Sequence, residues 1–199
     1  MPTFFPMIEP KPDLKVMRLD LVRIFGRDAR LQVDLGCGDG SFVCQLAQQF
    51  PDKNFLAIER LTKRVEKVRR EAEKIDNLRV LGTDTFFAVR YLLSGNSVET
   101  FYLLFPDPWP KRRHQQRRIF TGDFLDAVAG ALEQNGMLHV ATDHRDYFKQ
   151  IRSVSRAHPE FEPVDLNGVV RPLTKFERKF REQDLPIYRL TLRKTSPVK

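Results

Sequence analysis

The sequence contains little cysteine, no long apolar run and no low-complexity tract, and each absence excludes a class of protein. Cys37 and Cys44 are the only cysteines, and no Cys/His pattern has metal-site spacing, so we expect free thiols and neither a disulfide framework nor a bound metal. No apolar run approaches the roughly 20 residues that cross a membrane. Residues 1–12 hold four prolines and no basic start followed by an apolar stretch, which predicts an extended arm, no signal peptide and a cytoplasmic location.

The charge is unbalanced toward the basic side. Lysine and arginine number 34 against 26 acidic residues, which gives a net charge of +8 and makes a polyanion the expected large partner. Residues 111–118 include five lysines and arginines and no acid, so this segment is a candidate for phosphate contacts. Residues 63–74 mix both signs at helical spacing, which is typical of a solvated helix face.

Short apolar segments alternate with amphipathic ones along the chain. We expect strands over residues 31–35, 54–59, 78–82, 98–105 and 137–142, and helices over residues 41–49, 61–75, 85–93, 120–134 and 145–157. Weaker strands are expected over residues 161–166 and 187–192. This alternation predicts an α/β fold with a doubly wound, mostly parallel sheet. One domain over residues 21–199 would follow the arm of residues 1–20.

A glycine-rich turn follows the first expected strand. Asp34 to Gly40 read D-L-G-C-G-D-G, and glycines such as Gly36 and Gly38 let a backbone turn sharply and a ligand approach closely. The spacing G-x-G-x-G differs from the G-x-G-x-x-G of a dinucleotide-binding fold. Asp34 would also repel a pyrophosphate, whereas its carboxylate could bind the ammonium group of S-adenosylmethionine. The turn therefore predicts a site for that methyl donor.

Two further acids follow the next two strands, at the same expected edge of the sheet. Glu59 ends the second strand, where a carboxylate suits both hydroxyls of a ribose. Asp84 follows the third strand, where it could either accept a hydrogen bond from the adenine amino group or cap the helix expected from Thr85. Three successive acids at strand ends favour a bound cofactor.

The segment from Phe105 to His114, F-P-D-P-W-P-K-R-R-H, follows the fourth strand. Asp107 lies between two prolines, which restrict its backbone and favour a carboxylate held in one position. Trp109 could stack on a base or support the loop. The basic residues that follow indicate nucleic acid as the ligand beside this carboxylate.

Taken together, these motifs resemble the bacterial tRNA (guanine-N7-)-methyltransferase family of the TrmB type, over residues 31–192. Ala141-Thr142-Asp143 and the T-K-F-E sequence of residues 174–177, followed by Ile187-Tyr188, strengthen the resemblance. It implies a class I S-adenosylmethionine-dependent methyltransferase fold, which is Rossmann-like with a seven-stranded sheet and an antiparallel last strand. It also implies S-adenosylmethionine as donor, no metal, and N7 of a variable-loop guanosine in tRNA as acceptor.

The resemblance also assigns roles to individual residues. The cofactor side comprises Asp34, Gly36, Gly38, Glu59, Asp84 and Asp107, of which Asp107 is also the catalytic residue. The tRNA side comprises Lys111, Arg113, Arg117, Arg118, Asp143, Thr174, Lys175, Phe176 and Glu177. Thr174 could alternatively cap a helix that begins near Lys175. Two departures from the family pattern are Asp34, which replaces a glutamate common in relatives, and Asp184, which stands where many relatives have glycine.

Three other functions share parts of this pattern. A methyltransferase acting on an exocyclic amine would carry an acid or amide followed by Pro-Pro-aromatic, an order that residues 105–109 lack. A non-catalytic RNA-binding protein on the same scaffold would not need the acids at the strand ends. A nicotinamide oxidoreductase is disfavoured by the glycine spacing and by Asp34. The choice between monomer and homodimer stays open.

Overall fold

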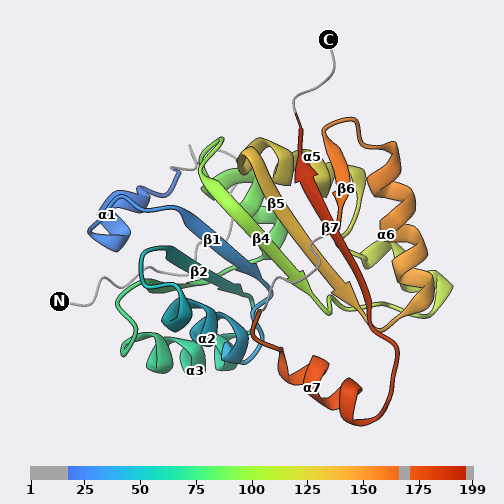
Figure 1. Cartoon of the computed structure of the whole chain (residues 1–199), viewed down its shortest axis with the longest axis horizontal. Helices are drawn as coiled ribbons and strands as arrows, with labels where there is room; N and C mark the ends of the chain where they lie inside the picture. Colours follow the sequence, from blue (N-terminus) through green and yellow to red (C-terminus); the bar gives the residue numbers. More distant parts are fainter. Residues whose placement is uncertain (1–17, 166–170, 196–199) are drawn as a thin grey trace.

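A computed structural model of the chain describes residues 18–165 and 171–195. Most of the predicted arm, and the last residue of the strand predicted over residues 161–166, lie outside these ranges. The centre of the molecule is a seven-stranded sheet with strand order β3-β2-β1-β4-β5-β7-β6 (Figure 1). Its strands are β1 (Leu31–Leu35), β2 (Asn54–Glu59), β3 (Leu78–Gly82), β4 (Val98–Leu104), β5 (Leu132–Thr142), β6 (Phe161–Val164) and β7 (Tyr188–Lys194).

The first five strands are parallel to one another, whereas β7 runs antiparallel to both of its neighbours, β5 and β6. The predicted fold class, a mostly parallel sheet with an antiparallel last strand, is therefore confirmed. The chain builds outward from β1 to β3 and then returns to place β4 on the other side of β1. In an open α/β sheet, ligands bind beyond the carboxyl ends of the strands at such a reversal.

Helices cover both faces of the sheet. The helices of the described residues are α1 (Leu21–Phe25), α2 (Ser41–Gln49), α3 (Thr62–Ala72), α4 (Thr85–Phe87), α5 (Gly122–Ala131), α6 (Arg145–Ala157) and α7 (Lys175–Glu182), with a π-helical turn η1 (Ala88–Leu92) and a 3-10 helix η2 (Arg112–Arg117). Side chains of α2 and α3 pack into one apolar cluster, and those of α1, η1, α5 and α6 pack into the other. The doubly wound arrangement follows from these two clusters on opposite faces.

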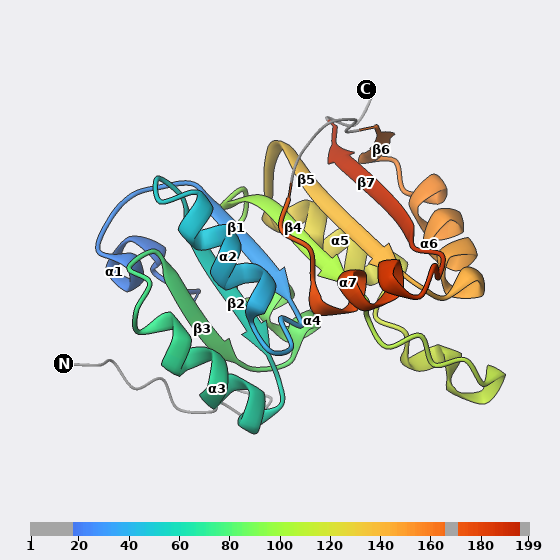
Figure 2. The same cartoon turned by 60° about the horizontal axis from the view of Figure 1, so that its bottom comes forward.

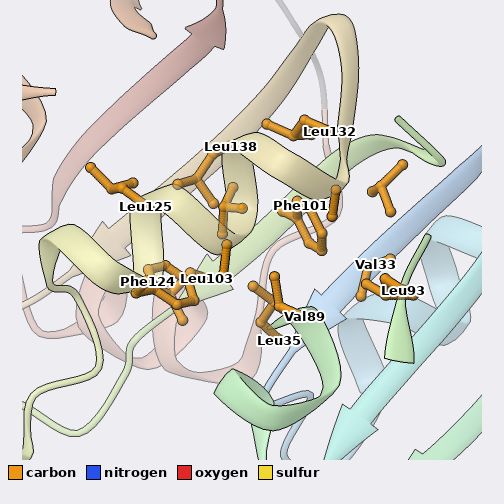
Figure 3. Close-up of a cluster of buried hydrophobic side chains, with 14 of the residues drawn as sticks. Val33, Leu35, Val89, Leu93, Phe101, Leu103, Phe124, Leu125, Leu132 and Leu138 are labelled. Atoms are coloured by element: carbon orange, nitrogen blue, oxygen red, sulfur yellow. The ribbon is translucent and has the colours of Figure 1, made fainter. Parts of the chain in front are cut away.

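The larger cluster fills the space between the sheet and α5 (Figure 3). Val33 and Leu35 of β1 and Phe101 and Leu103 of β4 all contribute to it, because alternate side chains of a strand point to the same face. Phe101 and Phe124 are fully buried. This packing fixes the two central strands, whose carboxyl ends carry the expected site.

Several elements differ from the prediction, and three of the differences have a clear physical reason. The sequence does not predict α1, because so short a helix shows no periodicity. The helix expected over residues 85–93 becomes π-helical from Ala88. Strand β5 begins at Leu132, earlier than expected, because Leu132 pairs with Val98 ahead of a register shift in the ladder and α5 ends before it.

Helix α7 lies apart from the two helical layers, near the carboxyl ends of β4 and β5 (Figure 2). The mixed-charge helix α3 buries only Val65, Val68 and Ala72, so the solvated face predicted for residues 63–74 is confirmed. Within residues 18–165 and 171–195, no helix is long and apolar enough to span a membrane.

Candidate active site

The glycine-rich turn leaves β1 with its backbone in left-handed conformations. Gly36, Gly38 and Gly40 have φ angles of 76°, 60° and 78°, which glycine adopts without steric cost. A Cβ atom at Gly36 or Gly38 would meet no described atom within 4 Å, so the backbone there borders open space. At Gly40 a Cβ atom would lie 2.7 Å from Cγ1 of Val68, so glycine lets α2 pack on α3. The turn presents a bare backbone to a ligand.

Asp34 lies under this turn and is only 4% exposed. Its carboxylate accepts no hydrogen bond from the part of the chain that the structure describes. Burial, followed by the nearby carboxylate of Glu59, raises the pKa of Asp34 to about 7. A buried carboxylate of this kind gains most from a positively charged partner. The ammonium group of S-adenosylmethionine fits that requirement.

Glu59 ends β2, and its carboxylate organises the same turn. Oε2 accepts a hydrogen bond from the backbone nitrogen of Gly38 at 3.1 Å, and Oε1 accepts from the backbone nitrogens of Arg60 and Leu61 at 2.9 Å each. Nη1 of Arg64 lies 3.7 Å from Oε2. A carboxylate offers about four acceptor positions, so Glu59 can bind a ribose hydroxyl while it ties β2 to the glycine turn.

Asp84 and Asp143 are exposed acids that follow β3 and β5. The side chain of Asp84 accepts from the backbone nitrogen of Phe87 at 3.0 Å and caps α4. The capping role of Asp84 is therefore confirmed, and contact with adenine stays a prediction. Contact between Asp143 and the substrate also stays a prediction. Among the residues described, no group of three or more His, Cys, Asp or Glu could hold a metal ion.

The first turn of α7 is held by a reciprocal cap. Thr174 Oγ1 accepts from the backbone nitrogen of Glu177 at 3.0 Å, and Glu177 Oε2 accepts from that of Thr174 at 2.8 Å. Glu177 is 7% exposed and also accepts a hydrogen bond from Nη2 of Arg189 at 2.9 Å. The cap at Thr174 is confirmed, and Glu177 serves to hold α7 against β7. Direct contact of either residue with tRNA stays a prediction.

A cavity of about 300 Å³ lies between α7 and the glycine turn. Asp34, Phe105 and the first turn of α7 contribute to its walls. Lys175 forms an ion pair with Asp39 of the turn. The ring of Phe176, which is 58% exposed, lies 5.8 Å from that of Phe105 between centroids. The cavity thus brings together these site residues predicted from sequence: Asp34, Gly36, Gly38, Thr174, Lys175 and Phe176.

Sequence analysis did not predict that Asp39 and Phe105 would contact α7. No local signal could have revealed these contacts, because each joins segments far apart in the chain. Glu59, Asp84, Asp107 and Asp143 do not line the cavity, although each lies at or just beyond the carboxyl end of a strand.

The loop that carries Asp107 is constrained on both sides. Phe105 and Trp109 have φ angles of 54° and 42°, a left-handed conformation that residues other than glycine seldom adopt. Pro106 and Pro108 lie between them, and a proline ring fixes its own φ. Asp107 is exposed, and its carboxylate makes no hydrogen bond to the residues described. The loop therefore holds a free carboxylate at a defined point of the sheet edge.

The basic segment after Trp109 forms η2, which extends from the sheet edge beside α6 (Figure 2). Lys111, Arg113 and Arg117 are all exposed. The guanidinium carbon of Arg117 lies 5.0 Å from the ring centroid of Trp109. Trp109 is half-buried and packs against the segment, whereas the supporting role predicted for it was that of a buried aromatic. Stacking on a base stays a prediction. The exposed cations thus lie on a projecting segment that follows Asp107 in the chain.

Arg118 differs from these neighbours because it is only 4% exposed. Its Nε donates to the carbonyl oxygen of Pro108 at 2.7 Å, and its Nη1 donates to Oε1 of Gln150 on α6 at 2.7 Å. The guanidinium carbon lies 4.8 Å from the ring centroid of Tyr147. The buried guanidinium thus joins the loop to α6, and contact of Arg118 with a tRNA phosphate stays a prediction.

Comparison with known proteins adds independent findings. A family model described as a putative methyltransferase matches residues 28–190. The chain is 33% identical over 187 residues to the tRNA (guanine-N(7)-)-methyltransferase of Nitrosococcus oceani, covering 92% of this chain and 79% of the relative. It is 40% identical over 169 residues to the protein of the same name from Halorhodospira halophila, with coverage of 81% and 73%.

Solved structures support the fold. The crystal structure of the 16S rRNA methyltransferase KamB matches with a TM-score of 0.63 at 17% identity, covering 90% of this chain and 95% of that one. At this identity the match concerns the fold alone. The family model and the relatives together show that the chain belongs to the tRNA (guanine-N7-)-methyltransferase family.

Proposed function

We propose that this protein transfers the methyl group of S-adenosylmethionine to N7 of a guanosine in the variable loop of tRNA, and that Asp107 orients the base. Its family makes it an S-adenosylmethionine-dependent tRNA (guanine-N7-)-methyltransferase. The target loop and the residue roles are proposals of our own. These proposals rest on two acids at one edge of the sheet. Asp34 is buried next to the glycine turn, and Asp107 is exposed and precedes the exposed cations in the chain.

The donor would be held by the residues of β1, β2 and the glycine turn. Asp34 lines the cavity, where an ammonium group would neutralise its carboxylate. Glu59 would accept from the ribose and Asp84 from the adenine amino group. When bound, S-adenosylmethionine supplies a methyl group on a positively charged sulfur. Lys175 and Phe176 line the same cavity from the side of α7, where they would contact the tRNA.

The acceptor would be held by the loop after β4. Guanine N7 carries an in-plane lone pair, so its methylation requires no proton removal and the main task of the enzyme is positioning. Asp107 would accept hydrogen bonds from guanine N–H groups and favour the positive charge that develops on the ring. Asp143, after the neighbouring strand, would bind the same base. Lys111, Arg113 and Arg117 would neutralise phosphates with little sequence readout.

The test is transfer of labelled methyl from S-adenosylmethionine to unmodified tRNA, followed by nucleoside analysis. N7-methylguanosine in the variable loop is expected, and label in another nucleoside would overturn the acceptor. Asp107→Asn removes a charged hydrogen-bond acceptor, so kcat should fall about 10- to 100-fold. Asp146→Asn, an exposed acid on α6, is the control and should leave kcat unchanged. Wild-type turnover by Asp107→Asn would refute the orienting role.

We also propose that residues 21–199 form one methyltransferase domain located in the cytoplasm. The family match over residues 28–190 and the packing of Phe25 of α1 into the larger core cluster support the single domain. A tRNA substrate supports the location.

A further inference from the structure

We infer that Arg118 is a positioning residue for methyl transfer, which fixes the backbone at Pro108 and through it the carboxylate of Asp107. The inference deepens the proposed function, because it rests on the role proposed for Asp107. It is an alternative to the role in phosphate binding that the sequence had suggested for Arg118.

The guanidinium of Arg118 contacts side chains of α6 that are held in the core. Tyr147 and Phe120 are fully buried, and the Tyr147 hydroxyl accepts a hydrogen bond from the backbone nitrogen of Phe120 at 3.2 Å. Gln150, which accepts from Arg118, also donates to the carbonyl oxygen of Phe120 at 3.4 Å. The guanidinium is thus tied to α6 and to the entry of α5, both of which belong to the core.

The other end of the interaction is the loop itself. Arg118 Nε donates to the Pro108 carbonyl at 2.7 Å, and the peptide that carries this oxygen leads directly into Trp109, whose φ is 42°. A left-handed residue other than glycine persists only where its surroundings enforce it. A hydrogen bond from a charged donor to the preceding carbonyl enforces that conformation. Because Pro108 follows Asp107 directly, the same bond limits where the carboxylate can lie.

The burial of this charge is difficult to explain by stability alone. Nη2 of Arg118 is buried and has no hydrogen-bond partner among the residues described, and a buried guanidinium that is incompletely paired is costly. Burial, with a smaller contribution from the Asp107 carboxylate, raises the pKa of Tyr147 to about 12.

The kinetic test compares Arg118→Ala and Arg118→Lys with Arg113→Ala, which removes an exposed cation of the same segment. Arg118→Ala should lower kcat about 10- to 100-fold through misplacement of the carboxylate, with the KM for tRNA and its salt dependence unchanged. Arg118→Lys should not restore kcat, because an ammonium cannot make two fixed, planar hydrogen bonds. Added guanidinium should partly restore Arg118→Ala. Arg113→Ala should instead raise KM and reduce its salt dependence.

The fluorescence of Trp109 tests directly whether Arg118 positions the loop. It is the only tryptophan of the chain and follows Pro108 directly, so its fluorescence reports on the loop. Arg118→Ala should increase acrylamide quenching of Trp109, and guanidinium should reverse the increase. If Arg118 variants fail to fold, Gln150→Ala, which removes the acceptor of Nη1 and a long hydrogen bond to the Phe120 carbonyl, should lower kcat and increase quenching to a smaller extent.

Two results would overturn the inference. A higher KM with a smaller salt dependence at unchanged kcat would make Arg118 a phosphate contact. A lower kcat without a change in Trp109 quenching and without rescue would show that Arg118 does not act by positioning the loop. Both leave the proposed function standing as long as the wild-type protein makes N7-methylguanosine, and loss of that product would refute the proposed function itself.

Discussion

Replacing Asp34 by asparagine should remove a pH-dependent loss of stability and weaken the binding of S-adenosylmethionine. In the folded protein without donor, burial raises the pKa of Asp34 from its usual value of 3.8 to about 7. Between pH 3.8 and about pH 7, Asp34 keeps its proton in the folded protein but has released it in the unfolded chain. The free energy of unfolding therefore falls as pH rises through this window, and the loss is complete above pH 7.

The size of the effect follows from the same pKa. Each pH unit within the window changes the free energy of unfolding by about 1.4 kcal/mol, so the contribution of Asp34 falls by about 2.5 kcal/mol between pH 5 and pH 8. An asparagine does not titrate. The stability of Asp34→Asn relative to the wild type should therefore rise by this amount across the series, whatever the fixed cost of burying an amide. Binding of S-adenosylmethionine should weaken about 10- to 100-fold, because the ammonium group loses a charged partner.

The assay is urea unfolding without donor at several pH values, with calorimetry for donor binding. Asp39→Asn is a matched control in the same turn. Burial would raise the pKa of Asp39, but hydrogen bonds from Lys175 and Ser41 outweigh it and lower the value to about 2, so Asp39 stays ionised throughout. Its variant should follow the wild-type pH profile at a constant offset. Parallel profiles for Asp34→Asn and wild type would show that the pKa of Asp34 is not raised in the folded protein.

Four further substitutions test other parts of the molecule. Gly40→Ala combines a positive φ with a clash against Val68. In a urea titration it should lower the free energy of unfolding by about 2 kcal/mol or more. Gly36→Ala has a positive φ but open space around the new Cβ atom, so it should lower the free energy of unfolding by only about 1 kcal/mol. Asp184 has a φ of 51°, so Asp184→Gly should raise the thermal midpoint and the free energy of unfolding by about 0.5–1 kcal/mol, and a loss would show that the side chain outweighs its backbone strain. Arg117→Ala should reduce the slope of log affinity for tRNA against log salt by about one unit, and an unchanged slope would remove Arg117 from the contact surface.

Local patterns in the sequence were sufficient for the framework. Alternating apolar segments determined the strands and helices, because side-chain periodicity differs between the two. Acids placed directly after strands indicated the ligand edge, since parallel strands bring their carboxyl ends together. The cap at Thr174 was readable because a capping box spans only four residues. Asp184 was marked as unusual, and its positive φ explains why a glycine suits that position.

The burial, ion pairing and pKa of the charged side chains could be learned only from the tertiary structure. Arg117 and Arg118 are indistinguishable as neighbouring cations in the sequence, yet one is exposed and the other is buried against Tyr147. The pairing of Lys175 with Asp39 and the raised pKa of Asp34 likewise depend on chain segments that meet only after folding. Periodicity and caps act between near neighbours, whereas desolvation and ion pairing depend on everything packed around a group.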